Sequence, residues 1–327
     1  MASLYLLLLG ILLLPFLLLL VLAFLAWPAP VKLQLKGRHV LISGGSSGIG
    51  LAMARQAASE GAHVSILARN PAKLEAAREA IRQATGSDVS ILSVDVQDFD
   101  SVSKAIQDAS PIDVLVANHG VYFSQELELQ DLQEIKLQVE INLMGTFHLI
   151  KAALPGMKQN AKNTNFPASI AIMSSQSGQV GIYGYGAYSA TKYALRGLAE
   201  ALRHEVVLDN IYVSLIFPPG TETPGFAEEK KRRSELINMI AASSGCMKAD
   251  EVAEKAFNGI KCGTFIIPCN FEGVMLAIAT AGLYPQNSCL GAFVEVIGAG
   301  FMRFVGLCFQ WKWFGIIEKY HAKRNGS

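Results

Sequence analysis

Three polar residues between positions 175 and 192 have types and spacing suited to proton transfer. Tyr188 and Lys192 are four residues apart, so on a helix their side chains lie on one face and can meet. A tyrosine has a pKa of about 10, and a neighbouring ammonium group favours its phenolate form. Ser175, upstream of this pair, can hydrogen-bond the same substrate oxygen. We therefore predict a catalytic set in which Tyr188 protonates a carbonyl oxygen, Ser175 stabilises charge on it and Lys192 tunes Tyr188.

A glycine-rich turn far upstream is suited to binding a cofactor. Gly44, Gly48 and Gly50 follow a β-branched run and precede a helical stretch. Glycine lets the backbone turn tightly and approach a pyrophosphate, which then lies at the positive end of the helix dipole. A plain glycine-rich loop is the alternative interpretation. The predicted contacts with a dinucleotide in this turn are Gly44, Ser46, Ser47, Gly48, Ile49 and Gly50.

Arg69 indicates which dinucleotide is preferred. It stands at the end of the second expected strand, where an acidic residue would bind the ribose hydroxyls of NAD. A carboxylate there repels a 2′-phosphate, whereas a guanidinium pairs with it. We therefore predict NADPH as the cofactor. The alternative is that Arg69 is a solvated arginine at the start of a helix.

Short β-branched runs alternate with longer helical stretches through the middle of the chain. This alternation predicts an α/β fold with a single Rossmann-type, doubly wound parallel sheet of about seven strands. Ligands then bind beyond the carboxyl ends of the strands. Strands are expected at 39–43, 63–68, 89–94, 112–117, 169–174, 212–217 and 265–267, and helices at 48–60, 71–85, 99–108, 129–158, 187–208 and 249–259.

Over about residues 36–265, these motifs together resemble the short-chain dehydrogenase/reductase family. The resemblance implies that Asp95 and Val96 contact the adenine ring. It also implies that Asn142 is the fourth catalytic residue and holds a proton-relaying water near Lys192. The remaining predicted cofactor contacts are Lys73, Asn118, Tyr188, Lys192, Pro218, Thr221 and Thr223.

Two positions depart from the pattern of that family. His119 follows Asn118 in a motif that usually carries small residues or asparagine, and we interpret its ring as packing rather than catalytic. Pro219 stands where the family has a glycine in the loop over the nicotinamide, which predicts a stiffer loop. For Thr221 and Thr223, ordinary turn chemistry is the alternative to cofactor contact.

Both ends of the chain are apolar. Residues 1–31 contain no charged side chain, which predicts an N-terminal transmembrane anchor. A cleavable signal peptide is the alternative, but it would need a basic start. Basic residues just after the segment predict that the following domain, 36–268, faces the cytoplasm. The remainder, 269–327, is expected to be a membrane-associated hydrophobic region with a basic tail; Glu295 and Arg303 make a simple second span unfavourable. Ordinary buried core is the alternative there.

Composition excludes several other classes of function. Lys and Arg number 28 against 27 Asp and Glu, so the chain lacks the basic surface of a nucleic-acid-binding protein. The five cysteines have no metal-ligand spacing, and we predict neither a metal site nor a disulfide framework. The expected partners are therefore a small molecule and a membrane.

Residues 174–202 and 218–229 carry a closer resemblance, to the 3-ketodihydrosphingosine reductases of that family. This implies NADPH-dependent reduction of 3-ketosphinganine to sphinganine in sphingolipid synthesis, at the cytosolic face of the endoplasmic reticulum membrane. Two alternatives are a membrane-bound steroid or retinoid dehydrogenase and an inactive membrane scaffold. Family members often pair through the helices that contain Asn142 and Tyr188, so a homo-oligomer is possible.

A substrate lid is expected at 224–240, between the sixth strand and the next helix. It combines the apolar Phe226, Leu236, Ile237, Met239 and Ile240 with the basic Lys230, Lys231, Arg232 and Arg233. Our hypothesis is that the basic residues face lipid headgroups and that the apolar residues line the entry for an alkyl chain. An ordinary amphipathic surface helix is the alternative.

Overall fold

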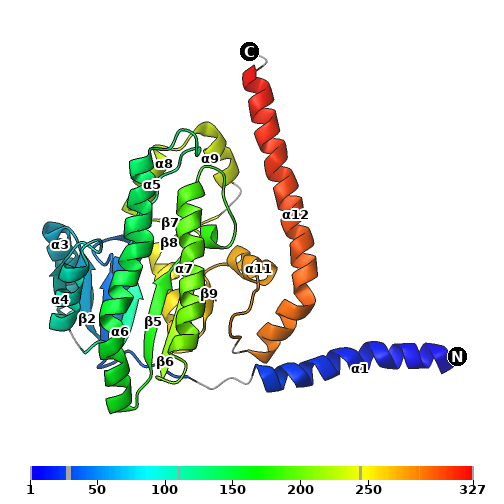
Figure 1. The fold of residues 1–327 in the computed structure, drawn as a ribbon, viewed down its shortest axis with the longest axis horizontal. Helices are drawn as coiled ribbons and strands as arrows, with labels where there is room; N and C mark the ends of the chain where they lie inside the picture. The colour runs from blue at the N-terminus through cyan, green and yellow to red at the C-terminus, as the bar shows by residue number, and fades with distance from the viewer. Residues whose placement is uncertain (1, 27–30, 110, 243–244, 287, 326–327) are drawn as a thin grey trace.

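The computed structural model describes residues 2–26, 31–109, 111–242, 245–286 and 288–325 (Figure 1). Its centre is a seven-stranded sheet with the order β3-β2-β1-β4-β5-β6-β9. Every pairing in it is parallel. The order reverses between β1 and β4, and this is the point at which such sheets bind ligands. The predicted doubly wound sheet is confirmed.

The strands form where the sequence is β-branched and apolar. β4 and β5 are buried along their whole length, as expected for central strands with helices on both faces. The first two strands have the predicted bounds, and the other five differ by one or two residues: β3 and β4 are shorter, β5 and β9 are shifted, and β6 is one residue longer. The strands are β1 His39–Ser43, β2 His63–Ala68, β3 Ser90–Ser93, β4 Val114–Ala117, β5 Ala168–Met173, β6 Ile211–Phe217 and β9 Ile266–Pro268.

Helices cover both faces of the sheet and enclose two apolar cores. On one face pack α2 (Gly48–Ser59), α3 (Pro71–Thr85) and α10 (Ala249–Lys261). On the other face pack α4 (Phe99–Ala109) and two long helices, α6 (Gly145–Thr164) and α7 (Gly186–Glu205) (Figure 1). Each helix packs its apolar face against the sheet. This packing holds the carboxyl ends of the strands, and the polar residues that follow them, in fixed positions.

The single helix predicted at 129–158 is interrupted in the structure. α5 (Leu132–Gln138) passes into a π-helical turn, Val139–Met144, and then into α6 (Gly145–Thr164). Single π-turns occur mainly at functional sites. Here the turn contains Asn142. Tyr188 and Lys192 lie on α7 (Gly186–Glu205), the next long helix after α6 and β5.

The segment predicted to be a lid consists of short elements that the sequence did not predict. α8 (Pro224–Lys230) and α9 (Glu235–Ala241) follow one another there. β7 (Gly220–Glu222) and β8 (Cys246–Lys248) pair in a small parallel sheet at its base. Backbone hydrogen bonds between β7 and β8 therefore join the two ends of the segment that contains α8 and α9.

The two apolar ends form long helices. α1 spans Ala2–Leu25 and leads away from the sheet, whereas α12 spans Cys289–Asn325 and runs beside the domain (Figure 1). They meet where Leu22 and Ala26 contact Ala292. Residues 27–30, at the end of the predicted anchor, lie outside the described residues. A shorter helix, α11 (Phe271–Ala279), packs between α12 and the domain.

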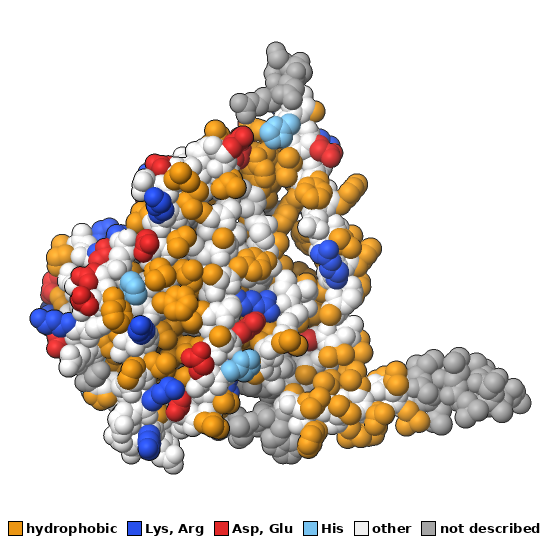
Figure 2. Space-filling model, viewed as in Figure 1, with side chains coloured by type: hydrophobic (Ala, Val, Ile, Leu, Met, Phe, Trp, Pro, Cys, Tyr) orange, Lys and Arg blue, Asp and Glu red, His pale blue; other side chains and the backbone are white. Residues whose placement is uncertain are grey.

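α12 differs from the expectation that this region would not form a simple span. Its segment Cys289–Lys323 is long and apolar enough to cross a membrane, and no other helix in the described ranges meets the same test. Almost none of this segment is buried, so the alternative of ordinary core is wrong. Hydrophobic side chains are prominent on the visible surface of α12, among white backbone and some charged groups, and on the described part of α1 (Figure 2).

Candidate active site

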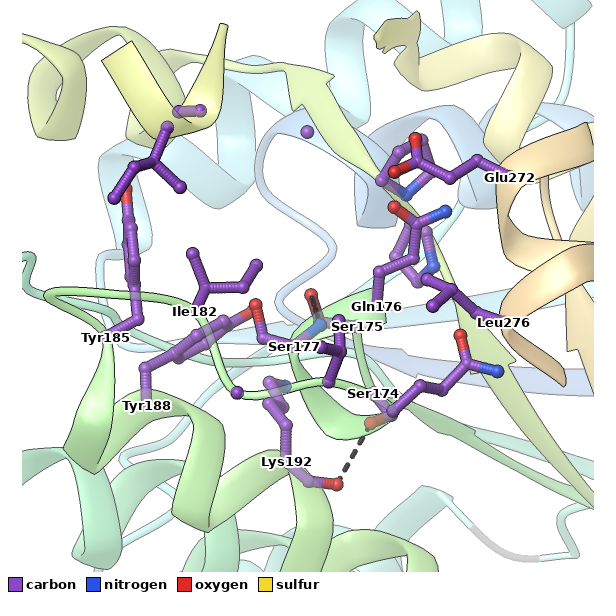
Figure 3. Close-up of a pocket in the computed structure, with 18 of the residues that line it drawn as sticks. Ser174, Ser175, Gln176, Ser177, Ile182, Tyr185, Tyr188, Lys192, Glu272 and Leu276 are labelled. Atoms are coloured by element: carbon purple, nitrogen blue, oxygen red, sulfur yellow. Dashed lines mark hydrogen bonds between the residues drawn. The ribbon is translucent and has the colours of Figure 1, made fainter. Parts of the chain in front are cut away.

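The predicted catalytic residues come together at the carboxyl end of β5. Ser175 follows that strand, and Tyr188 and Lys192 lie one turn apart on α7 (Figure 3). Lys192 Nζ donates a hydrogen bond of 2.9 Å to the Met173 carbonyl and lies 5.6 Å from the centroid of the Tyr188 ring. The Tyr188 and Ser175 side chains point toward the same opening (Figure 3).

The protonation properties of this pair differ from the expectation. Burial raises the pKa of Tyr188 to about 12, although a hydrogen bond with Ser175 opposes the shift. Burial also lowers the pKa of Lys192 to about 8. The predicted lowering of the tyrosine pKa by lysine is thus outweighed, because loss of solvent disfavours both charged forms. A raised pKa keeps Tyr188 in the protonated form that a proton donor needs.

Hydrogen bonds hold Asn142 near Lys192, which we predict to be catalytic. Its Oδ1 accepts a hydrogen bond of 2.8 Å from the Val121 amide, and its Nδ2 donates one of 2.8 Å to the Val121 carbonyl. Nδ2 also lies 3.2 Å from Thr191 Oγ1 on α7. These bonds tie the π-helical turn to the loop after β4 and to the helix of the catalytic tyrosine.

His119 holds the same π-helical turn from the other side. Its Nε2 lies 3.0 Å from the Ile141 carbonyl, and its Nδ1 lies 2.7 Å from Ser43 Oγ. The only arrangement that satisfies the carbonyl has the proton on Nε2, so Ser43 donates to Nδ1. Burial, reinforced by the charge of Lys192, lowers the pKa of His119 to about 3. The ring is neutral and structural, in agreement with its interpretation as packing.

Aromatic side chains that the sequence did not single out surround Tyr188. The ring centroids of Tyr122 and Tyr188 are 5.4 Å apart, and those of Tyr185 and Tyr188 are 6.3 Å apart. The Tyr185 hydroxyl donates a 2.6 Å hydrogen bond to Glu229 in the lid. The only sequence signal for these residues was the position of Tyr185 close to Tyr188.

Arg233 corrects the hypothesis that four basic lid residues face lipid headgroups. Its Nη2 lies 2.7 Å from Glu229 Oε2, and the two side chains are 9% and 4% exposed. The guanidinium therefore points inward, because a buried carboxylate needs a charged partner. Lys230, Lys231 and Arg232 are exposed, although Lys231 pairs with Glu228 and Arg232 with Glu134.

The apolar lid residues also divide into two groups. Leu236, Ile237 and Ile240 are buried, while Met239 is 42% exposed. Phe226 and Ile240 line the cavity that contains the catalytic residues. Part of the predicted apolar set therefore faces the site, and Met239 faces away from the lid core.

The glycine-rich turn has the shape of a pyrophosphate cradle. Gly44 and Gly48 have positive φ angles of 66° and 56°, which favour glycine. A Cβ on Gly50 would lie 2.2 Å from the Gly44 carbonyl oxygen. Ser47 caps α2 without using its side chain for the cap, so its hydroxyl and the first amides of the helix can bind an anion. These residues fit a dinucleotide.

The neighbouring predicted contacts lie around this cradle. Asn118 Nδ2 donates to the Ser43 carbonyl at 3.2 Å and would lie 2.5 Å from a Cβ on Gly50. Asn118 thus braces the turn and also lines the cavity, as do Ile49 and the loop residues Pro218, Thr221 and Thr223.

Thr223 and Thr221 both have structural roles in the loop after β6. Thr223 Oγ1 caps α8 by accepting from the Phe226 amide at 3.1 Å, and its methyl group packs on Gly48. Thr221 Oγ1 donates to the Pro219 carbonyl at 2.9 Å. Turn chemistry therefore accounts for both hydroxyls, and of the two residues Thr223 is the one that packs against the glycine turn.

Arg69 and Asp95 lie side by side at the ends of β2 and β3. Arg69 Nη1 is 3.9 Å from Asp95 Oδ2, and both side chains are accessible, at 57% and 37%. Lys73 is exposed in the first turn of α3, and Val96 is buried. The structure therefore leaves a positively charged edge beside the position predicted for adenine.

The catalytic residues open into a cavity of about 930 Å³. This is near the upper end of the range for small-molecule sites. Ser175, Tyr188 and Lys192 form part of one wall, and residues of α11 and α12 form another. Within the described parts of the chain there is no cluster of residues that could hold a metal ion, and the five cysteines are free.

Comparison with known proteins identifies the family. A family model described as short chain dehydrogenase matches residues 38–234. The chain belongs to the short-chain dehydrogenase family. The family resemblance of the sequence motifs is thereby confirmed. A solved short chain dehydrogenase/reductase family protein is 27% identical, covers 73% of this chain and 98% of its own, and has a TM-score of 0.62. Levodione reductase, at 24% identity and a TM-score of 0.65, shares the fold over 74% of this chain and 98% of its own.

Curated relatives match a longer part of the chain than the family model does. The 3-dehydrosphinganine reductase TSC10A of Arabidopsis thaliana is 54% identical over 293 residues, which are 90% of this chain and 89% of that protein. The 3-ketodihydrosphingosine reductase of Bos taurus is 34% identical over 299 residues, 89% of each chain. The closer resemblance noted at residues 174–202 and 218–229 is thus confirmed along most of the chain.

Proposed function

We propose that this protein reduces the 3-keto group of 3-ketosphinganine to a hydroxyl, giving sphinganine, with NADPH as reductant. The observation that carries the proposal is the meeting of Ser175, Tyr188 and Lys192 at one wall of a large cavity with apolar neighbours. The names of relatives 54% and 34% identical supply the substrate class.

The chain's own residues account for the proton side of the reaction. A nicotinamide dinucleotide, when bound at the glycine turn, supplies hydride to the carbonyl carbon. Ser175 donates a hydrogen bond to the carbonyl oxygen, and Tyr188 transfers its phenolic proton to that oxygen as negative charge develops. The Lys192 ammonium stabilises the phenolate that remains. Asn142 fixes the loop and helix around this ammonium, and its predicted role in proton relay stays part of the proposal.

The preference for NADPH rests on Arg69. Its guanidinium is exposed at the end of β2, Lys73 adds positive charge in the first turn of α3, and such groups can pair with a 2′-phosphate. We expect Arg69→Asp to lower kcat/KM with NADPH and to shift the ratio toward NADH. Arg82→Asp makes the same charge change further along α3 and should leave the ratio unchanged. Equal ratios in the two variants would contradict this assignment.

The proposed location is the endoplasmic reticulum membrane, with the catalytic domain in the cytoplasm. α1 has 24 apolar or small residues and no charge. At about 1.5 Å per residue it is about 36 Å long, enough to cross a hydrocarbon core of about 30 Å. Lys32, Lys36 and Arg38 follow it and favour a cytoplasmic domain. In sealed microsomes, protease added from outside should cleave the catalytic domain; protection until detergent is added would reverse the orientation.

A direct assay tests the proposed activity. The full chain in detergent or liposomes is incubated with NADPH and 3-ketosphinganine, and sphinganine is measured by mass. Tyr188→Phe should lower kcat by about 10²–10⁴ with little change in cofactor binding. Tyr185→Phe, which removes a nearby hydroxyl outside the relay, is the control. Absence of sphinganine with the unmodified chain, or preferential turnover of a steroid or retinal, would overturn the substrate assignment.

A further inference from the structure

The catalytic cavity continues well beyond the residues that perform the chemistry. Glu272 and Leu276 of α11 lie near Gln176 (Figure 3), and Met275 of the same helix also lines the cavity. Behind them the lining passes to α12. The residues that α12 contributes are Met302, Arg303, Val305, Gly306, Phe309, Gln310, Trp313, Phe314 and Ile317. A helix that belongs by composition to the membrane therefore forms part of the catalytic pocket.

The α12 contribution follows one face of the helix. Met302, Val305, Phe309, Trp313 and Ile317 are separated by three or four residues, which places them on a single stripe. From the first to the last of these positions the helix rises about 22 Å. Half of a bilayer hydrocarbon core, the depth of one acyl chain, is about 15 Å. The stripe is thus long enough for an extended alkyl chain.

Exposed apolar side chains also lie on α12 outside the cavity lining. Phe301, Phe304, Leu307 and Trp311 are 63%, 61%, 47% and 81% exposed. Exposed apolar surface of this extent on a helix marks contact with a membrane or a partner. α12 therefore has two different apolar sides, one that lines the cavity and one that faces outward.

Both charges in the first half of α12 fit this arrangement. Glu295 accepts a hydrogen bond from the Tyr284 hydroxyl and one of 2.8 Å from Gln286 Nε2, so its carboxylate is held by the loop before the helix. Arg303 lies on the cavity side, where water in the cavity can solvate its charge. Ionisable residues in membrane helices generally face such interior spaces.

We propose that α12, with α11, forms the wall of a channel that binds the alkyl chain of the substrate and determines which chain lengths are reduced. This inference rests on the proposed function, because the ketone must lie at Tyr188 for the chain to extend along α12. Binding the tail removes apolar surface from water, while the reacting carbonyl stays with the polar residues at the end of β5.

Gly306 offers a sharp test of the channel. It lines the cavity, and a Cβ at this position would meet nothing within 4 Å. Because the Cβ position is open and faces the cavity, Gly306→Phe should project its ring into the channel. Gly300 and Gly315 lie on the same helix, also have open space around an added Cβ, and do not line the cavity. Gly300→Phe and Gly315→Phe are matched controls for helix propensity and membrane insertion.

The measurement is kcat/KM for two 2-amino-3-keto alcohols, one with 18 carbons and one with 10, with each variant in identical liposomes. We expect Gly306→Phe to lower the value for the 18-carbon ketone at least tenfold and to change the 10-carbon value less than twofold. Both controls should keep the ratio of the unmodified chain. An unchanged ratio in Gly306→Phe, or the same shift in a control, would overturn the channel.

A second variant covers the case in which Gly306→Phe does not fold. Phe309→Ala enlarges the same stripe and should raise the relative kcat/KM for ketones with chains longer than 18 carbons. An unchanged length profile would again reject the inference. If the unmodified chain reduces neither ketone, the proposed function fails. Channel binding is then judged by quenching of fluorescence with a brominated long-chain amine in a Trp27→Phe/Trp311→Phe background, which leaves Trp313 as the one tryptophan of the chain. Adding Gly306→Phe to this background must reduce the quenching for the channel to stand.

Discussion

His119 gives the protein a built-in sensitivity to acid. Its imidazole is neutral in the fold, because burial and the nearby Lys192 charge lower its pKa to about 3. In the unfolded chain a histidine has a pKa of about 6.5. As the pH falls below 6.5, the unfolded state therefore binds a proton that the folded state does not, and stability decreases. The contribution of the neutral ring is fully present above pH 6.5.

The size of the effect at pH 5.5 depends little on the folded value. One unit below the unfolded pKa, protonation favours the unfolded state by about 1.4 kcal/mol. For a domain of this size, that corresponds to a fall in Tm of about 3–6 °C. His119→Gln keeps an amide donor that can reach the Ile141 carbonyl but cannot bind a proton.

Melting curves in detergent at pH 7.5 and pH 5.5 test this reasoning. The unmodified chain should lose about 3–6 °C more than His119→Gln between the two pH values. His63→Gln, which removes an exposed imidazole at the start of β2, should behave as the unmodified chain does. The same loss in His119→Gln as in the unmodified chain would refute the assignment of a neutral, clamping histidine.

Three further perturbations test other parts of the structure. Because burial lowers the pKa of Lys192 to about 8, kcat/KM for reduction should be constant at lower pH and fall about tenfold per unit above pH 8; a profile flat to pH 10 would contradict this. Gly48→Ala, at φ 56° and beside Thr223, should cost about 1–2 kcal/mol of stability and weaken NADPH binding in a fluorescence titration. Arg233→Leu leaves the Glu229 carboxylate buried without its partner and should destabilise the fold by about 3–5 kcal/mol in denaturant unfolding, whereas a loss below 1 kcal/mol would show that the pair is hydrated.

The sheet was predictable because its signals are local. β1 and β2 have the expected bounds, since each is a short apolar run flanked by polar or glycine residues. Glycine and proline also mark where helices begin and end: α3 starts at Pro71 and is followed by Gly86 in a left-handed conformation. No glycine or proline marks the π-helical turn at Val139–Met144. A π-helical turn adds one residue to a helix, and the apolar pattern continues on both sides of it, so the sequence indicates one unbroken helix.

The residues of the relay were predictable, but their energetics were not. The interval between Tyr188 and Lys192 fixes that they lie on one face of a helix. The sign of the pKa shift depends on how deeply the pair is buried, and that depth is set by Tyr122 and by the lid, which are distant in sequence. The same limit explains Arg233, which in a run of basic residues resembles surface charge. Glu229, four residues earlier, was the one available signal that it turns inward.

In the C-terminal region, a rule based on charge counts alone is misleading, because contacts with distant residues determine where each charge lies. Counting charges in the window that begins at Cys289 argues against a membrane helix, because an isolated Glu295 or Arg303 in lipid would be costly. In the structure, Tyr284 and Gln286 hold Glu295, and the cavity receives Arg303. Both charges are therefore on the side of α12 that belongs to the enzyme, and the outward side stays apolar. If α12 were only an anchor, selection for lipid solubility alone would remove these charges; their positions are accounted for if the helix is also a wall of the active site.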